Sequence, residues 1–173
     1  LSEFKKLGYD ICGVDPAQVP SKIANESGIF TYNDFFNENT IKKILKKFGK
    51  PFLITSQNAL AHIDDLQGTF RNIYNLLDDN GYFIFEVGYF LSVLEKKLFD
   101  TIYHEHLDYH HASPLVQHLT NLGFQAIKII RVNSQGGSIR LLFKNNFSEN
   151  HLIVFASCES AGFFVWIWGS KFF

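Results

Sequence analysis

Short apolar runs that alternate with segments of helical periodicity constrain the fold of this chain most. The runs cover residues 9–16, 28–32, 52–56 and 82–87, and helix-length segments separate them. A continuous apolar run is typical of a strand buried on both faces, and a helix between two such strands lets them lie parallel. The sequence therefore predicts an α/β fold with βαβ units and a doubly wound, mostly parallel sheet.

Capping residues and helix breakers divide the chain further. The predicted helices are residues 2–7, 17–27, 41–48, 64–77 and 114–122. Asn39 and Thr40 are predicted to cap the third of these helices, and Gly123 ends the last one. Residues 124–132 and 138–144 have strand-like patterns with no helix between them. We therefore expect an antiparallel hairpin to finish the sheet.

Length and charge exclude several classes of protein. The 173 residues make about one domain, since domains run to roughly 100–200 residues. The net charge of -1 does not favour a polyanion, so nucleic acid is not an expected partner. No run approaches the ~20 apolar residues of a membrane-spanning helix, and no signal peptide is recognisable at the start. We expect a cytoplasmic protein without a membrane partner, and its oligomeric state is not predicted.

The two ends of the chain differ from the rest. The chain begins with Leu1 and contains no methionine, so we expect it to be a piece of a longer protein. Residues 162–168 are apolar on every side, and such a segment is an aggregation liability when it is exposed. It is either a core strand or part of a truncated or altered end, and the sequence does not decide between these. We predict one domain over residues 1–145 and the start of a truncated or altered region over residues 146–173.

Residues 99–111 hold the densest group of side chains that bind metals or move protons. The segment shows neither the period of a strand nor that of a helix, so it is predicted to be a loop next to the sheet. One interpretation is a metal site, because His104, His106, His110 and His111 have the spacing of zinc or iron ligands. The sequence alone leaves this interpretation open.

A second interpretation of the same loop is proton transfer. Imidazole titrates near neutral pH, so His106 is suited to act as a base or an acid, with Tyr103 beside it. If the loop is extended, successive side chains alternate, which places Tyr103 and Glu105 on one side and His104 and His106 on the other. A solvated polar loop without chemistry is the third possibility.

Polar side chains also follow two of the predicted strands. Asp15 stands at the end of the first run, where ligands bind in doubly wound folds, and a carboxylate there is suited to accept hydrogen bonds from ribose hydroxyls. Equally, Asp15 could cap the helix at 17–27 with Pro16 in its first position. Asn58 and His62 follow another strand and share one face if their segment is helical.

Four motifs together resemble a known family. They are residues 13–17 (GVDPA), 58–62 (NALAH), 99–106 (FDTIYHEH) and 136–140 (GGSIR). Their order and spacing are similar to those of S-adenosylmethionine-dependent C-methyltransferases that act on nucleotide-linked (dTDP-type) keto-deoxysugars, over roughly residues 1–145.

The resemblance implies a Rossmann-like class I methyltransferase domain. Members of that family have an N-terminal zinc-binding module, a central methyltransferase domain and a C-terminal substrate domain. By this resemblance the chain is mostly the central domain, without its first strand, and S-adenosylmethionine is the expected cofactor. Zinc would belong only to the N-terminal module, whose cysteines are absent from this chain, so no metal is expected here.

The resemblance also implies catalytic roles. His106 would be the base that removes the proton alpha to the ketone, and Tyr103 and Glu105 would orient the base and the sugar. His62, together with Asn58, would stabilise the enolate or position the substrate.

The binding residues follow from the same resemblance. The expected cofactor-binding residues are Asp15, Pro16, Ser56 and Asn58. Glu86 and Tyr89 are expected to contact the nucleotide-sugar substrate. Gln135 stands where a histidine is often found in that family. Two alternatives remain, a metal-dependent enzyme that uses the histidine cluster and an inactive truncated remnant of the methyltransferase.

Overall fold

The computed structural model describes residues 1–145 in full and residues 164–168 as backbone. Its strands are β1 (Ile11–Val14), β2 (Thr31–Tyr32), β3 (Leu53–Gln57), β4 (Tyr82–Gly88), β5 (Phe124–Val132), β6 (Ser138–Asn145) and β7 (Phe164–Trp168). Its α-helices are α1 (Ser2–Lys6), α2 (Gln18–Glu26), α3 (Glu38–Phe48), α4 (Leu66–Leu76), α5 (Phe90–Lys96) and α6 (Ala112–Asn121). Two 3₁₀ turns, η1 (Leu60–His62) and η2 (Phe99–Thr101), lie in the loops.

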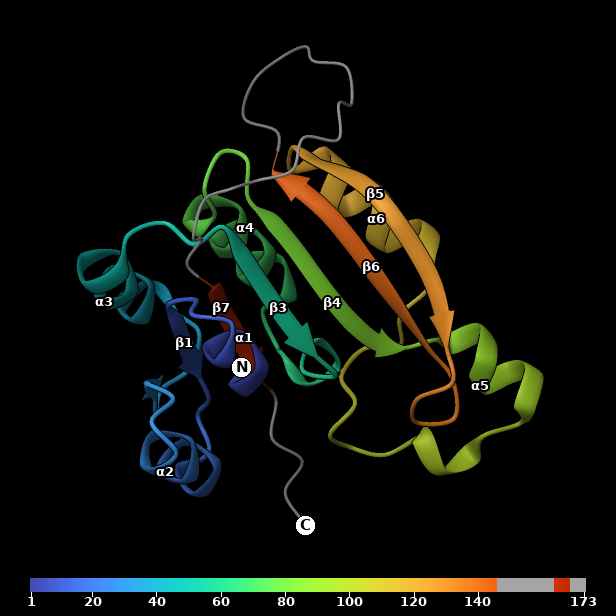
Figure 1. Cartoon of the computed structure of the whole chain (residues 1–173). Helices are drawn as coiled ribbons and strands as arrows, with labels where there is room; N and C mark the ends of the chain where they lie inside the picture. Colours follow the sequence, from blue (N-terminus) through green and yellow to red (C-terminus); the bar gives the residue numbers. More distant parts are fainter. Residues whose placement is uncertain (146–163, 169–173) are drawn as a thin grey trace.

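The strands form one seven-stranded sheet in the order β2-β1-β7-β3-β4-β6-β5 (Figure 1). The first five strands in this order pair in parallel, and β6 pairs antiparallel with both β4 and β5. The predicted α/β class, the parallel sheet and the terminal antiparallel hairpin are confirmed. The carboxyl ends of the parallel strands meet at one edge, which is the edge where ligands bind in such sheets.

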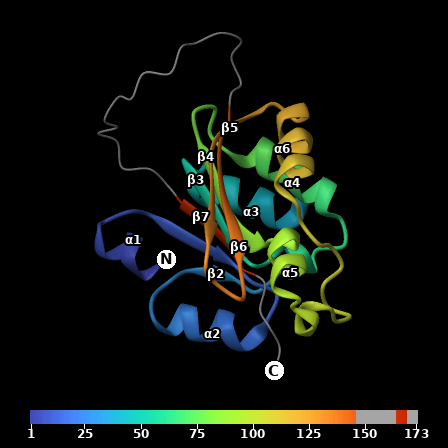
Figure 2. The same ribbon diagram turned by 90° about the vertical axis from the view of Figure 1, so that its right-hand side faces the viewer.

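Helices cover both faces of the sheet. In Figure 2, α3, α4 and α6 lie on one side of it, and α1 and α2 lie on the other. The larger core lies under α3, α4 and α6, and its fully buried aromatic rings are Phe70, Phe83, Phe85, Phe124 and Phe143. Burying a ring of this size stabilises the fold by about 1.5–3 kcal/mol. Five of the 19 phenylalanines therefore hold the sheet to its helices.

Strand β7 joins two groups of strands that do not otherwise pair. Its register places Ile167 between Val14 of β1 and Ser56 of β3. Residues 164–168 were expected to lie outside the domain of residues 1–145, yet their backbone pairs in the middle of its sheet. The boundary at residue 145 stays a prediction, and the remainder of 146–173 lies outside the described residues.

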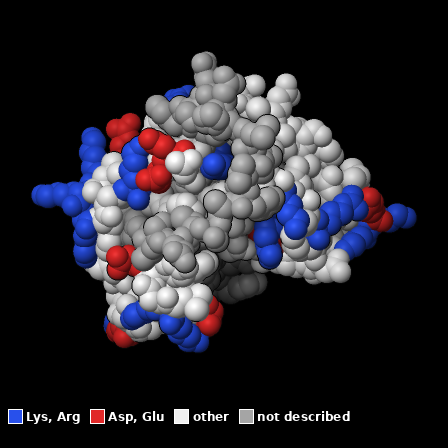
Figure 3. All heavy atoms as spheres, turned by 45° about the horizontal axis from the view of Figure 1, so that its top comes forward, with Lys and Arg blue, Asp and Glu red and all other residues white. Residues whose placement is uncertain are grey.

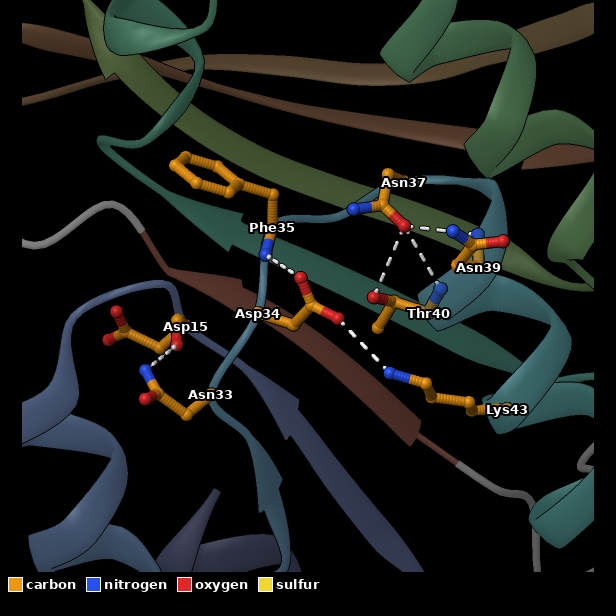
Figure 4. A network of polar contacts seen from close by, with 8 residues as sticks. All are labelled: Asp15, Asn33, Asp34, Phe35, Asn37, Asn39, Thr40 and Lys43. Atoms are coloured by element: carbon orange, nitrogen blue, oxygen red, sulfur yellow. Dashed lines mark hydrogen bonds and ion pairs between the residues drawn. The ribbon is translucent and has the colours of Figure 1, made fainter.

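Two local predictions need correction. The cap of α3 is Asn37, whose side-chain oxygen accepts hydrogen bonds from the backbone N–H groups of Asn39 and Thr40 at 3.0 and 3.1 Å (Figure 4). Asn37 is the cap because its backbone is extended, which directs the side chain towards the free N–H groups of the first turn. Helix α5 was not predicted, because it has no capping side chain at its start and ends at Lys97 instead of a glycine.

The surface and the helices add two observations. On the face seen in Figure 3, acidic side chains stand among the basic ones, so the described part of that face has no extended surface of one charge. None of the helices built from the described residues has the length and apolar character required to cross a membrane.

Candidate functional site

Loops at the carboxyl edge of β3 and β4 enclose a cavity of about 250 Å³. Residues from four separate segments line it, one of them the end of β4 with the start of α5, and the lining includes Asn58, His62, Tyr103, His106 and Gln135. The structure therefore brings together the segment after β3, the predicted loop of residues 99–111 and the turn before β6. Of the four residues predicted to be catalytic, His62, Tyr103 and His106 line this cavity.

The imidazole of His106 is held at both nitrogens. Its Nδ1 lies 2.8 Å from the carbonyl oxygen of Thr101, and its Nε2 lies 3.0 Å from the hydroxyl of Tyr103. Because a carbonyl can only accept, Nδ1 must carry the proton. In the neutral ring Nε2 then presents a lone pair, which accepts the Tyr103 hydroxyl. This is the tautomer that a base acting through Nε2 requires.

A tight turn places Tyr103 beside His106. The N–H of His106 donates to the carbonyl of Tyr103 at 3.1 Å, and the two ring centroids are 4.2 Å apart. The expectation for an extended loop, in which these side chains point in opposite directions, is therefore wrong. The turn over residues 103–106 reverses the chain, so its side chains do not alternate as they would in a strand.

The second cavity histidine is anchored in the same way. Nδ1 of His62 lies 2.8 Å from the carbonyl oxygen of Glu105, and its ring centroid is 5.0 Å from that of His106. The segment from Asn58 is not an α-helix as assumed. Asn58 has a left-handed backbone with φ of 51°, and His62 ends the turn η1. Both nevertheless line the one cavity.

Two neighbouring groups have shifted pKa values. Burial raises the pKa of Tyr103, and the nearby charges of Glu105 and Tyr109 act in the same direction, so its hydroxyl stays a hydrogen-bond donor. Burial lowers the pKa of His110, which keeps that ring neutral. The Nε2 atom of His110 is buried without a hydrogen-bond partner among the described residues.

The histidine cluster does not form a metal site in the part of the chain that is described. The His104 side chain is 90% exposed and stands 4.0 Å from the Glu105 carboxylate, while His111 caps α6. Within residues 1–145 no three His, Cys, Asp or Glu side chains are placed to bind one metal ion. The carboxylate of Glu105 lies beside His104, and its backbone carbonyl is the part that contacts a cavity residue.

A second group of polar atoms lies at the carboxyl edge on either side of β7. One carboxylate oxygen of Asp15 accepts the N–H of Ala17 at 2.8 Å, and the other is buried without a partner among the described residues. The hydroxyl of Ser56 is buried and equally unpartnered. Burial raises the pKa of Asp15, against the hydrogen bond from Ala17. Orphaned buried acceptors of this kind fit a ligand that brings its own hydroxyl groups.

Asp15 does not cap the following helix. Helix α2 begins at Gln18 after Ala17, so the interpretation with Pro16 in its first position is wrong. Pro16 is exposed, and its carbonyl accepts a hydrogen bond from Asn33 at 2.9 Å.

The loop after β2 was not predicted to take part. Asn33 donates to the carbonyl of Asp15 at 3.1 Å, and Asp34 forms an ion pair with Lys43 at 3.2 Å (Figure 4). That pairing lowers the pKa of Asp34. Between these anchored residues and α3 lies Phe35, which is 70% exposed at the same edge of the sheet. A polar pair followed by aromatic residues after a short strand is the signal in the sequence that could have identified this loop.

The two predicted substrate contacts have other partners in the structure. The buried carboxylate of Glu86 accepts from Arg140 Nη2 at 2.7 Å and from the hydroxyl of Ser134. Tyr89 is buried, with its ring 5.5 Å from that of His111 and under the guanidinium of Arg131. Neither lines the cavity, and their contact with substrate stays a prediction.

Comparisons with known proteins agree on the family and the fold. Residues 1–129 match the family described as "Methyltransferase domain". The C-methyltransferase NovU of Streptomyces niveus is 30% identical over 139 residues, which are 80% of this chain and 33% of NovU. The chain thus spans about a third of the length of that relative.

Solved structures share the fold at low sequence identity. One is a SAM-dependent methyltransferase of Thermotoga maritima, described as a possible histamine N-methyltransferase. It matches with a TM-score of 0.59 at 14% identity, and the match covers 81% of this chain and 74% of the Thermotoga chain. Another is the N-methyltransferase NodS of Bradyrhizobium japonicum, solved with S-adenosyl-L-homocysteine. It matches with a TM-score of 0.50 at 9% identity, and the match covers 83% of this chain and 84% of the NodS chain. At these identities the likeness establishes the fold alone.

Proposed function

Because the chain belongs to the methyltransferase domain family, we propose that it carries the catalytic core of an S-adenosylmethionine-dependent C-methyltransferase. The proposed substrate is a nucleotide-linked (dTDP-type) keto-deoxysugar, methylated on the carbon alpha to its ketone. The hydrogen-bonded pair of Tyr103 and His106 in the cavity carries the proposal, because its contacts give the neutral His106 ring the tautomer that a base acting through Nε2 requires. The relationship to the C-methyltransferase NovU supports it.

The chemistry requires a carbon nucleophile. S-adenosylmethionine supplies an electrophilic methyl group on a sulfonium. A carbon beside a ketone becomes nucleophilic when it loses a proton, and its C–H electron pair then forms the enolate. In our proposal Nε2 of His106 takes that proton. The Nδ1–H bond to the carbonyl of Thr101 keeps the ring in place and stabilises the imidazolium that results.

Tyr103 is the proposed donor to the enolate oxygen. At rest its hydroxyl donates to Nε2 of His106. The lone pair of Nε2 takes the substrate proton when this hydroxyl turns away, and the hydroxyl then donates to the new oxyanion, as preorganised donors do in such sites. The raised pKa of Tyr103 favours this role, because the hydroxyl keeps its proton.

His62 is proposed to position the substrate or stabilise the same oxygen. Its Nδ1 is committed to the Glu105 carbonyl, so Nε2 accepts in the neutral ring and donates only in the imidazolium. Only protonated His62 can therefore donate to an enolate, whereas a sugar hydroxyl can donate to the neutral ring or accept from the protonated one. Glu105 would act through its backbone in holding His62.

The cofactor would lie along the edge between β1 and β3. Asp15 would accept hydrogen bonds from the ribose hydroxyls, and Ser56 would bind a polar group nearby, since each has an unpartnered buried oxygen. In the sequence, Pro16 directly follows Asp15, and Asn58 stands two residues after Ser56. The exposed ring of Phe35 would pack against the nucleoside base.

Methyl transfer from carbon-13-labelled S-adenosylmethionine to dTDP-4-keto-6-deoxyglucose tests the proposal. The account expects the label on a ring carbon, which the NMR shift of the methyl group distinguishes from a methyl on oxygen or nitrogen. His106→Ala should abolish transfer and leave the affinity for S-adenosylhomocysteine within about twofold, since a general base contributes about 10²–10⁴-fold. A label on oxygen, or normal turnover by the variant, would refute the assignment.

A further inference from the structure

Three non-glycine residues in the described part of the chain have a positive φ. They are Asn58 at 51°, Lys97 at 54° and Gln135 at 47°. A residue with a Cβ is strained in this region, which glycine adopts more easily. Non-glycine residues that are nevertheless held there cluster at functional sites. Asn58 and Gln135 line the same cavity as His106, whereas Lys97 is the C-cap of α5.

The backbone around Gln135 is fixed on both sides. Ser134 donates its hydroxyl to the buried Glu86, and its carbonyl accepts the N–H of Gly137 at 2.8 Å. The carbonyl of Gly136 accepts from Lys96 at 2.6 Å, and that of Gly137 accepts from the N–H of Tyr89. The turn therefore presents residue 135 at a set position beside the cavity.

The two glycines that follow leave the turn little freedom to move. A Cβ on Gly136 would lie 2.7 Å from a methyl carbon of Leu98, and one on Gly137 would lie 2.6 Å from Cβ of Ser92. Both glycines also have a positive φ. This close packing makes the left-handed conformation of Gln135 a property of the fold and not of its own side chain.

The side chain of Gln135 has no role within the described fold. It is exposed and makes no hydrogen bond to a described residue, although glycine would suit its backbone better. Its uncharged amide offers both donors and acceptors, which match hydroxyl and carbonyl groups better than a diphosphate. We propose that Gln135 is a substrate-recognition residue that binds an oxygen of the sugar ring and holds the alpha carbon near His106. This inference rests on the proposed function.

Three variants test the inference. Gln135→Gly removes the strain and the amide, Gln135→Ala removes the amide alone, and Lys97→Gly removes strain at a site outside the cavity. We expect Tm to rise by about 2–4 °C in both glycine variants, since about 1 kcal/mol shifts Tm by that amount in a chain of this size. Gln135→Ala should leave Tm close to that of the wild type.

Kinetics and binding separate recognition from stability. For methyl transfer to dTDP-4-keto-6-deoxyglucose, KM should rise about tenfold in both Gln135 variants, because the sugar oxygen loses its hydrogen-bond partner. Lys97→Gly should keep the wild-type KM, and all three variants should keep the wild-type affinity for S-adenosylhomocysteine.

The possible failures point to different errors. A wild-type KM in both Gln135 variants would overturn the recognition role and leave the proposed function intact. A lower Tm in Gln135→Gly would also overturn it, because the side chain would then be stabilising the fold. A wild-type chain that transfers no methyl group would overturn the proposed function and this inference together.

Discussion

The two polar regions at the carboxyl edge of the sheet differ in how their groups are satisfied. In the proposed catalytic half, which comprises His62, Tyr103 and His106, each imidazole is fixed by a backbone carbonyl at 2.8 Å. In the proposed cofactor half, one carboxylate oxygen of Asp15 and the hydroxyl of Ser56 have no partner among the described residues. The first half is thus arranged without a ligand, whereas we propose that a ligand completes the second. The following changes test that difference.

Breaking β7 should disturb both halves at once. Val165 pairs with Cys12 on one side and Ile54 on the other. Proline there removes a ladder hydrogen bond in the middle of the sheet, and each buried group left unpaired costs about 1–3 kcal/mol. We expect Val165→Pro to lower the urea midpoint of unfolding strongly and to abolish binding of S-adenosylhomocysteine.

Val165→Ile is the matched control for this variant. It keeps a β-branched apolar side chain and the backbone N–H, so it should unfold and bind much closer to the wild type than Val165→Pro does. If Val165→Pro also unfolds and binds like the wild type, residues 164–168 are not a central strand.

Changing Asp15 should affect the cofactor half alone. Asp15→Asn is expected to weaken S-adenosylhomocysteine binding about 10–100-fold in calorimetry, because hydrogen bonds to a charged acceptor contribute about 1.5–3 kcal/mol. Exposed Asp10, changed to Asn, serves as the control. Equal affinity in the two variants would remove Asp15 from the cofactor site.

The same carboxylate gives a pH dependence. Because burial raises the pKa of Asp15, it takes up a proton at a higher pH than an exposed aspartate does. Affinity of the wild type for S-adenosylhomocysteine should therefore fall as the pH falls towards that raised pKa. Asp15→Asn, which has nothing to titrate, should show a flatter profile in calorimetry over the same range.

Removing the Tyr103 hydroxyl should slow catalysis without weakening cofactor binding. Tyr103→Phe deletes one donor to the proposed enolate, and one such donor contributes up to about 10²–10³-fold in kcat. A steady-state assay should show a lower kcat, with the affinity for S-adenosylhomocysteine unchanged. A change in KM alone would mean that Tyr103 binds substrate and does not stabilise the enolate.

The smallest effect concerns the neutral histidine behind the cavity. Since burial lowers the pKa of His110, the unfolded chain binds its proton more readily than the folded chain does. Its contribution to stability is present above its ordinary pKa of 6.5 and is lost as the pH falls below it.

Urea unfolding at about pH 7.5 and about pH 5 measures this effect. His110→Phe should lose less stability on acidification than the wild type. Exposed His104, changed to Gln, should behave like the wild type. An identical acid loss in all three proteins would show that His110 does not contribute.

Local sequence patterns predicted where strands form better than which strands pair with each other. The apolar runs predicted to end near Asp15 and Ser56 correspond to β1 (Ile11–Val14) and β3 (Leu53–Gln57), so the strands end within two residues of the prediction. The pairing of Phe164–Trp168 with β1 and β3 was not predictable, because an apolar run indicates a strand and not its neighbours. Likewise, the bond between Glu86 and Arg140 spans 54 positions and depends on the antiparallel register.

The site shows the same limit. The motif at residues 99–106 pointed to Tyr103 and His106, which line the cavity, but not to the turn that brings the Tyr103 hydroxyl within 3.0 Å of Nε2 of His106. Nothing in the sequence marks the carbonyls of Thr101 and Glu105, because every residue has one. Tautomer and orientation of both histidines depend on these backbone contacts.

We propose that the catalytic half abstracts a proton without help from the cofactor half. Incubating the chain with dTDP-4-keto-6-deoxyglucose in D₂O, without S-adenosylmethionine, tests this through deuterium uptake at the alpha carbon, followed by NMR. We expect uptake in the wild type and in Asp15→Asn, and a loss of about 10²-fold or more in His106→Ala. Uptake that persists in His106→Ala, or no uptake by the wild type, would contradict it.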